Sequence, residues 1–133
     1  MATVHELSLP GAQIEQIVRE ENSLRIVFSD FRILISLTGS NERTEWTQRG
    51  ELIIGNAEVE NELPTPPLTL AGGDIHQNAY VYRNEIPLPL KSRGQVGCVL
   101  QFEGIDERLE VHGESIELIE TAERKYIRHV RDN

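Results

Sequence analysis

The chain has 133 residues, enough for one domain, and no apolar run approaches the ~20 residues that a membrane-spanning helix needs. Thirteen basic and 22 acidic side chains give a formal net charge of −9, which argues against binding to nucleic acid. The single cysteine, Cys98, excludes an intramolecular disulfide and a cysteine-based metal cage. The first residues show neither the basic nor the apolar segment of a secretory signal, so we expect a cytoplasmic protein.

Short runs of alternating apolar and polar residues follow one another along the chain, separated by turns rich in glycine and asparagine. The runs are residues 14–18, 24–28, 33–37, 96–102 and 109–111. Such alternation is typical of strands with one face on a core. The sequence therefore predicts one all-β domain over residues 1–133, either an antiparallel β-sandwich or a partly closed barrel, with at least eight strands.

The alternation also predicts which side chains form the core. Ile14, Gln16 and Val18 are expected to share one face of the first strand. The residues expected to be mostly buried are Ile14, Val18, Leu24, Ile26, Phe28, Ile35, Leu52, Ile54, Val81, Val96, Cys98, Leu100 and Phe102.

Two proline-containing stretches interrupt the pattern. Residues 63–67 contain three prolines, too many missing N–H donors for a central strand, so we expect an extended connection between two sheets. Residues 86–90 alternate proline with aliphatic residues and are expected to lie at a sheet edge.

The C-terminal segment fits two structures. Residues 115–118 and 125–130 fit a hairpin of two strands joined through residues 121–124. The alternative is one short helix, since Leu118, Ala122 and Tyr126 follow a helical spacing. We favour the hairpin because it extends the alternation of the preceding strands.

The sequence contains no recognisable catalytic or cofactor motif. Ser40 lies in a turn and not in a nucleophile elbow, while Cys98 lies in phase with apolar neighbours and reads as a buried thiol. The glycine pairs lack the residues of a phosphate-binding loop. We therefore predict no catalytic residue and no cofactor.

Histidine and carboxylate side chains recur at two places. His112 shares a strand face with Glu110 and Glu114, and these groups could converge on a divalent ion only if neighbouring strands or loops added ligands. Asp74 and His76 form a second pair after a Gly-Gly turn. A solvated sheet face explains the first pattern and a turn aspartate the second, so no metal site is predicted.

Two further features bear on binding. Trp46 stands in a polar stretch and is the best candidate for an aromatic platform under a sugar, although a packing role is favoured. Residues 103–123 carry eight acidic side chains and one arginine, which suits attraction of a basic partner or simple solubility. The candidate ligand or partner surface is therefore Trp46, Glu110, His112 and Glu114.

Residues 12–17 and 24–28, together with the stretch from Trp46 to Val59 and the closing Tyr126-Ile127, resemble segments of several small bacterial all-β families. These families are mostly of uncharacterised function, and some members are similar to immunity proteins, which neutralise a partner toxin. The resemblance covers about half of the chain. Its motifs are structural, and Pro10-Gly11 replaces a His-Asp pair often seen in such openings, so no functional residue is carried over.

Together these observations favour a non-enzymatic binding domain, of the immunity type, that recognises a basic protein. The alternatives are a carbohydrate- or small-ligand-binding sandwich and, less favoured, a metal-dependent enzyme. Because an open sheet leaves edges to be paired, we also expect a homodimer. Neither a nucleic acid nor a membrane is expected as a partner.

Overall fold

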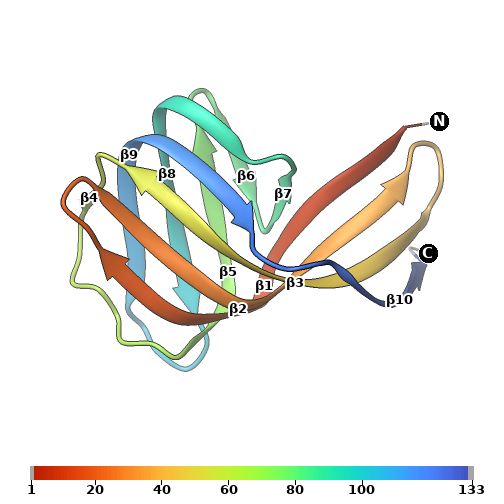
Figure 1. Ribbon diagram of the computed structural model, residues 1–133, viewed down its shortest axis with the longest axis horizontal. Coiled ribbons are helices and arrows are strands. Elements are labelled where there is room, and N and C mark those ends of the chain that lie inside the picture. Colours follow the sequence, from red (N-terminus) through yellow and green to blue (C-terminus); the bar gives the residue numbers. More distant parts are fainter. Residues whose placement is uncertain (1, 132–133) are drawn as a thin grey trace.

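The computed structural model describes residues 2–131, which form ten β-strands and no helix (Figure 1). No membrane-spanning helix is therefore found in that part of the chain. The strands are β1 (Thr3–Arg19), β2 (Ser23–Leu37), β3 (Glu42–Gly55), β4 (Glu58–Val59), β5 (Leu68–Gln77), β6 (Tyr80–Arg83), β7 (Glu85–Pro87), β8 (Lys91–Phe102), β9 (Arg108–Glu120) and β10 (Lys125–Arg131).

All ten strands belong to one antiparallel sheet, which confirms the predicted all-β class. The order is β10-β3-β2-β1-β5-β8-β9-β4, with β6 beside β5 and β7 beside β1. An additional pairing of β3 with β9 closes six strands into a barrel. The barrel alternative therefore describes the chain, and residues 60–67 connect β4 to β5 within one sheet instead of joining two sheets.

Three strands are too long for the barrel and continue beyond it. β1, β2 and β3 have 17, 15 and 14 residues, whereas a typical strand has 3–10. We call the extension the arm. It comprises residues 3–8 of β1, 31–37 of β2, 42–48 of β3 and all of β10. Figure 1 shows it reaching to the right of the barrel, with the N-terminal end of the chain at its tip.

Register shifts bend the strands where the barrel passes into the arm. They fall between Ser8 and Gln13 in β1 and between Phe28 and Phe31 in β2. An extra residue in one strand of an antiparallel pair bends that strand and increases its twist. Because of the shift in β2, Phe28 and Phe31 are both buried although they are three residues apart.

The core agrees with the predicted alternation except at two residues. Val18 is 36% exposed, because register shifts between Gln13 and Gln16 change the phase of β1 and bring Ile17 to the core face in its place. Val81 is 56% exposed, because β6 is a short strand that pairs, among the residues described, only with β5, and its Tyr82 packs against the core instead. Both residues were predicted to be buried, and those predictions are wrong.

The C-terminal segment forms two strands, so the helical alternative is wrong. The predicted hairpin is also wrong, because β10 does not pair with β9. Both strands pair with β3 instead, β9 along residues 50–55 and β10 along residues 42–47. Residues 85–87 form the edge strand predicted for the proline stretch, and within the described part of the chain they pair only with β1.

Gly50 lies where β3 passes from one partner to the other. A Cβ atom at this position would lie 2.6 Å from the carbonyl oxygen of Ile119 and 2.9 Å from the ring of Phe31. A glycine is therefore required for β9 and the Phe31 ring to approach β3 so closely.

Cys98 provides a test of the barrel core. Its side chain is completely buried, and burial raises the pKa of the thiol to about 12. Since the thiolate is the reactive form, we expect an alkylating reagent to modify Cys98 roughly a hundredfold or more slowly in the folded protein than in denaturant. Mass spectrometry of timed samples gives both rates, and equal rates would place Cys98 outside the core.

Candidate functional site

The structure brings together the two histidine-carboxylate pairs that the sequence shows far apart. Both pairs lie on the outer face of the barrel, flanking the central strand β8. Asp74 of β5 and Glu110 of β9 lie opposite Val99, and His76 and His112 lie opposite Gly97. Four candidate ligand side chains thus occupy two neighbouring rows of one face.

Glu110 and His112 form a local contact, but Glu114 does not join them. The Nε2 atom of His112 is 3.6 Å from Glu110 Oε1, and Arg108 is 3.4 Å from the same carboxylate. Glu114 instead accepts a hydrogen bond from the Asn56 side chain at 2.6 Å. The predicted group of Glu110, His112 and Glu114 is therefore divided between two surroundings.

The carboxylates of the acidic segment, residues 103–123, also lie in different surroundings. Glu117 lies 3.6 Å from Lys91, and Glu120 forms a two-point ion pair with Arg124 at 2.7 and 2.8 Å. Within the described residues, Glu103, Asp106 and Glu107 of the β8–β9 turn form no such ion pair. The segment thus combines paired carboxylates on β9 with open ones in the β8–β9 turn.

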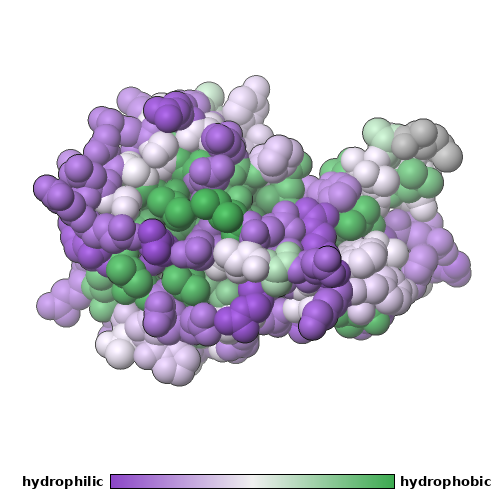
Figure 2. All heavy atoms as spheres, in the orientation of Figure 1, coloured by the Kyte–Doolittle hydropathy of each residue, from purple (hydrophilic) through white to green (hydrophobic). Residues whose placement is uncertain are grey.

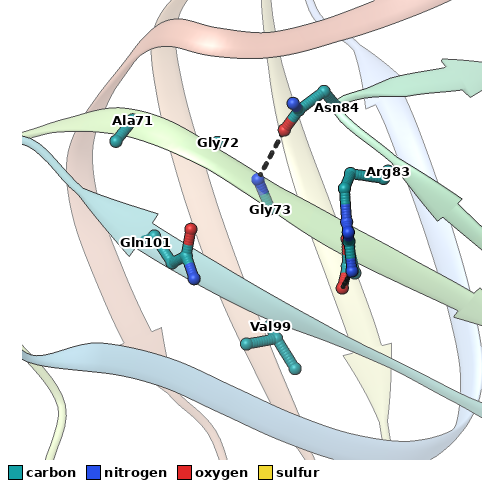
Figure 3. Close-up of a pocket in the computed structure, with 8 residues that line it drawn as sticks. Ala71, Gly72, Gly73, Arg83, Asn84, Val99 and Gln101 are labelled. Atoms are coloured by element: carbon teal, nitrogen blue, oxygen red, sulfur yellow. Dashed lines mark hydrogen bonds and ion pairs between the residues drawn. The ribbon is translucent and has the colours of Figure 1, made fainter.

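A polar pocket of about 320 Å³ lies on this face beside β5 (Figure 3). Its floor is the backbone of Gly72 and Gly73, and its walls include Arg83 and Gln101. Arg83 donates two hydrogen bonds to Asp74, and this contact holds the pKa of the Asp74 carboxyl below its usual range. Asp74 therefore stays ionised beside the pocket.

Asn84 joins the two strands that separate at this pocket. β1 and β5 are paired at only two positions, and Asn84 bridges them further along. Its backbone N–H donates to Gly73 O at 2.8 Å, its Oδ1 accepts from Gly73 N–H at 3.0 Å, and its carbonyl oxygen accepts from Leu9 N–H at 2.7 Å. Its φ of 64° is one that asparagine tolerates.

A second pocket of about 320 Å³ contains both histidines of the outer face. Its lining includes His76, Asn78, Gln95 and His112. The Nε2 atom of His76 is buried and has no hydrogen-bond partner among the described residues. Within residues 2–131, no group of three or more His, Cys, Asp or Glu side chains is arranged to hold a metal ion.

Trp46 lies away from both pockets, at the base of the arm. It is half-buried against the core and meets the Tyr126 ring edge to face at 5.4 Å. Its Nε1 donates a hydrogen bond to Thr44 Oγ1 at 2.8 Å. A tryptophan held in this way is a packing residue that joins β10 to β3 within the arm.

β10 is an edge strand of the sheet. Among the described residues it pairs with β3 on one side and with nothing on the other, and six of its seven residues are exposed. Its cations contact carboxylates of β3, with Arg128 3.0 Å from Glu45 and Arg131 paired to Glu42. The edge therefore offers free backbone donors and acceptors next to a row of basic side chains.

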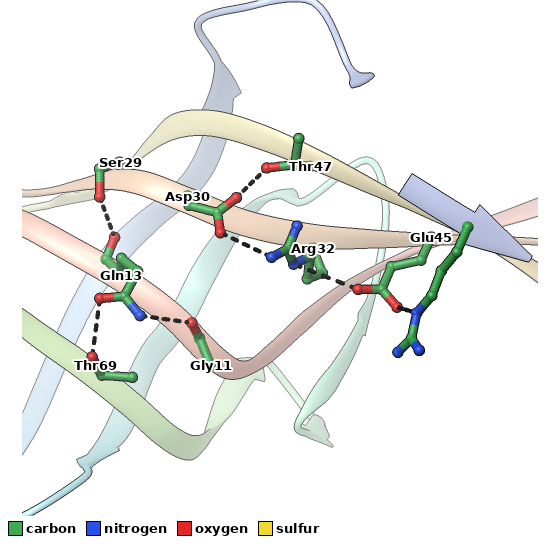
Figure 4. A network of polar contacts seen from close by, with 9 residues as sticks. Gly11, Gln13, Ser29, Asp30, Arg32, Glu45, Thr47 and Thr69 are labelled. Atoms are coloured by element: carbon green, nitrogen blue, oxygen red, sulfur yellow. Dashed lines mark hydrogen bonds and ion pairs between the residues drawn. The ribbon is translucent and has the colours of Figure 1, made fainter. Parts of the chain in front are cut away.

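A polar network supports the bend between the barrel and the arm (Figure 4). Asp30 of β2 accepts a hydrogen bond from Thr47 and lies 3.4 Å from Arg32. Arg32 lies 3.5 Å from Glu45, which also binds Arg128 of β10. The network thus connects the bent part of β2 to the edge strand.

The linker between β9 and β10 is fastened to the arm by a second network. Gln48, 2% exposed, donates hydrogen bonds from its amide to Glu120 and to the carbonyl oxygen of Ala122. The Arg124 guanidinium lies 2.6 Å from His5 Nδ1 on β1. These five residues could not be found from the sequence, because their positions span most of the chain and share no local pattern.

Neither a family model, nor a curated protein, nor a solved structure matches this chain.

Asn84 is the residue on which the junction of β1 and β5 most depends. Replacing it with alanine removes the acceptor for Gly73 N–H and leaves a residue that tolerates a positive φ poorly. We expect Asn84→Ala to lower the free energy of unfolding by about 1–3 kcal/mol in urea denaturation. Asn84→Asp keeps the acceptor and is the control, so equal losses in both variants would contradict the bridging role.

The Glu120–Arg124 pair predicts a pH dependence of stability. The Arg124 guanidinium lowers the pKa of Glu120 from its ordinary 4.5, so the ionised carboxylate stabilises the fold above pH 4.5. That contribution is lost as the pH falls through the lower folded-state value. Glu120→Gln should therefore cost about 0.5–1 kcal/mol at pH 7 and progressively less below pH 4.5 in chemical denaturation. Glu123→Gln is the control, and a cost that does not vary with pH would exclude this origin.

Proposed function

We propose that this protein is a non-catalytic binding module that docks an extended segment of a partner protein along the free edge of β10. The observation that carries this proposal is the seven-residue strand, which among residues 2–131 pairs only with β3 and has six exposed residues. A strand edge of this kind is a template for main-chain hydrogen bonds, and adding a strand is a recurrent mode of peptide recognition.

The surroundings of the edge supply the side-chain contacts that such docking needs. Tyr126 and Ile127 are 55% and 39% exposed, and Leu37 is exposed at the nearby β2–β3 turn. Figure 2 shows hydrophobic residues on the arm, set among hydrophilic ones. A pocket of about 280 Å³ between His129 and Ile35 adjoins the edge and could receive one anchoring side chain.

The basic side chains of β10 disfavour pairing with β10 of a second copy of this chain and favour a different partner. In an antiparallel pairing of β10 with itself that uses all seven residues, Arg128 would face Arg128 and Lys125 would face Arg131. Like charges directly opposite destabilise a strand pair. The docking segment we propose is therefore acidic at these positions, while the homodimer and the basic partner expected from the sequence stay predictions.

Site-directed crosslinking tests this proposal. A photoreactive residue at position 127 should crosslink the partner in the producing cell, whereas one at position 81, exposed on β6, should not. The partner identified in this way should bind the purified protein at least tenfold more weakly after Ile127→Pro, measured by calorimetry, because proline interrupts the donors of the edge. Val81→Ala is the matched control.

Three outcomes would overturn the proposal. They are crosslinks from position 81 alone, equal binding by the proline variant, and a light-scattering mass of twice 15.1 kDa that Ile127→Pro returns to 15.1 kDa. The last result would assign the edge to a second copy.

A further inference from the structure

We propose that His76 and His112 together bind a divalent transition-metal ion, such as Zn²⁺ or Ni²⁺, on the outer face of the barrel. The two residues come from strands that do not pair with each other, β5 and β9, and they line one pocket. This site is independent of the β10 edge and of the function proposed for it.

No side chain of β8 stands between the two histidines in their row, and both line the same pocket. β8 lies between β5 and β9, so the backbones of His76 and His112 are about 9.6 Å apart, twice the usual spacing of neighbouring strands. In their row the residue of β8 is Gly97, which has no side chain, whereas Val99 separates Asp74 from Glu110 in the next row. The imidazoles are therefore the pair that can lean toward each other and share one ion.

The unsatisfied ring nitrogen of His76 is an independent reason to expect a ligand. Its Nε2 is buried without a hydrogen-bond partner among the described residues, and most buried polar atoms in proteins have one. A metal ion would satisfy this nitrogen. Neutral imidazole is the form that binds metals.

The neighbouring carboxylates fit the role of supporting groups. Glu110 lies 3.6 Å from His112 Nε2, close enough to orient that ring and leave Nδ1 for the metal. Asp74, which is paired with Arg83, lies in the next row of the same face. Since no third protein ligand converges in residues 2–131, water would complete the coordination.

The ligand type determines which ions fit. Imidazole nitrogen suits Zn²⁺, Ni²⁺ and Cu²⁺, whereas Ca²⁺ and Mg²⁺ prefer oxygen ligands. An ion held by both rings would also cross-link β5 to β9 over β8 and so stabilise the barrel. Binding and stabilisation should therefore occur together.

The test is titration of the full chain with ZnCl₂ and NiCl₂ by calorimetry, with the melting temperature measured in parallel. We expect one ion per chain, a metal-dependent rise in melting temperature and no response to CaCl₂. His76→Gln and His112→Gln should each weaken binding at least tenfold and abolish the rise. His129→Gln, which changes an exposed histidine of β10, should leave both unchanged.

Melting temperatures in EDTA show whether each variant is folded, and NMR of the imidazole protons reports the ligands directly in the unmodified protein. Shifts confined to His76 and His112 on adding Zn²⁺ support the site. The proposal is overturned if no ion binds, if either glutamine variant binds as the unmodified chain does, or if the signals of His5 or His129 shift instead.

Discussion

Each edge of a β-strand can pair with only one other strand at a time, and this constraint organises the whole molecule. The meander of β1, β2 and β3 is longer than a barrel needs, so each of its two outer edges is divided between two partners. β3 pairs with β9 along one half and β10 along the other. β1 pairs with β5 along one part and β7 along another. The barrel forms where the pairing is with β5 and β9, and the arm forms where it is with β7 and β10.

The residues with special structural roles lie where β1 and β3 change from one pairing strand to another. Gly50 admits the close approach of β9 just after β3 leaves β10, and Asn84 joins the strands at the division of β1. Gln48 lies two residues from Gly50, and its buried amide binds the linker that carries the chain from β9 to β10. A buried amide that is fully hydrogen-bonded specifies one arrangement of the segments around it.

Strand identity could be predicted from the sequence, because alternation is a local property of a few consecutive residues. Leu24, Ile26 and Phe28 were assigned to the core in this way and are buried. The predictions failed where one extra residue changed the phase, as at Val18, and where pairing depended on distant segments, as for β10. The sequence showed each histidine with its neighbouring carboxylate as a separate pattern. That His76 and His112 lie on either side of Gly97 follows from the order of β5, β8 and β9.

The two proposed sites depend on different parts of the fold. The His76–His112 pocket lies on β5 and β9, which at these two residues pair with β8 on one side and with the short strands β6 and β4 on the other, so two ladders hold each histidine in place. β10 is held by one ladder, by the ion pairs of Arg128 and Arg131, and by the Glu120–Arg124 linker. Regions with few buried contacts open at the lowest free energy, and binding segments are commonly drawn from them. An edge strand fastened by surface pairs to a rigid barrel can therefore adjust to an incoming strand without disturbing the pocket on the far strands.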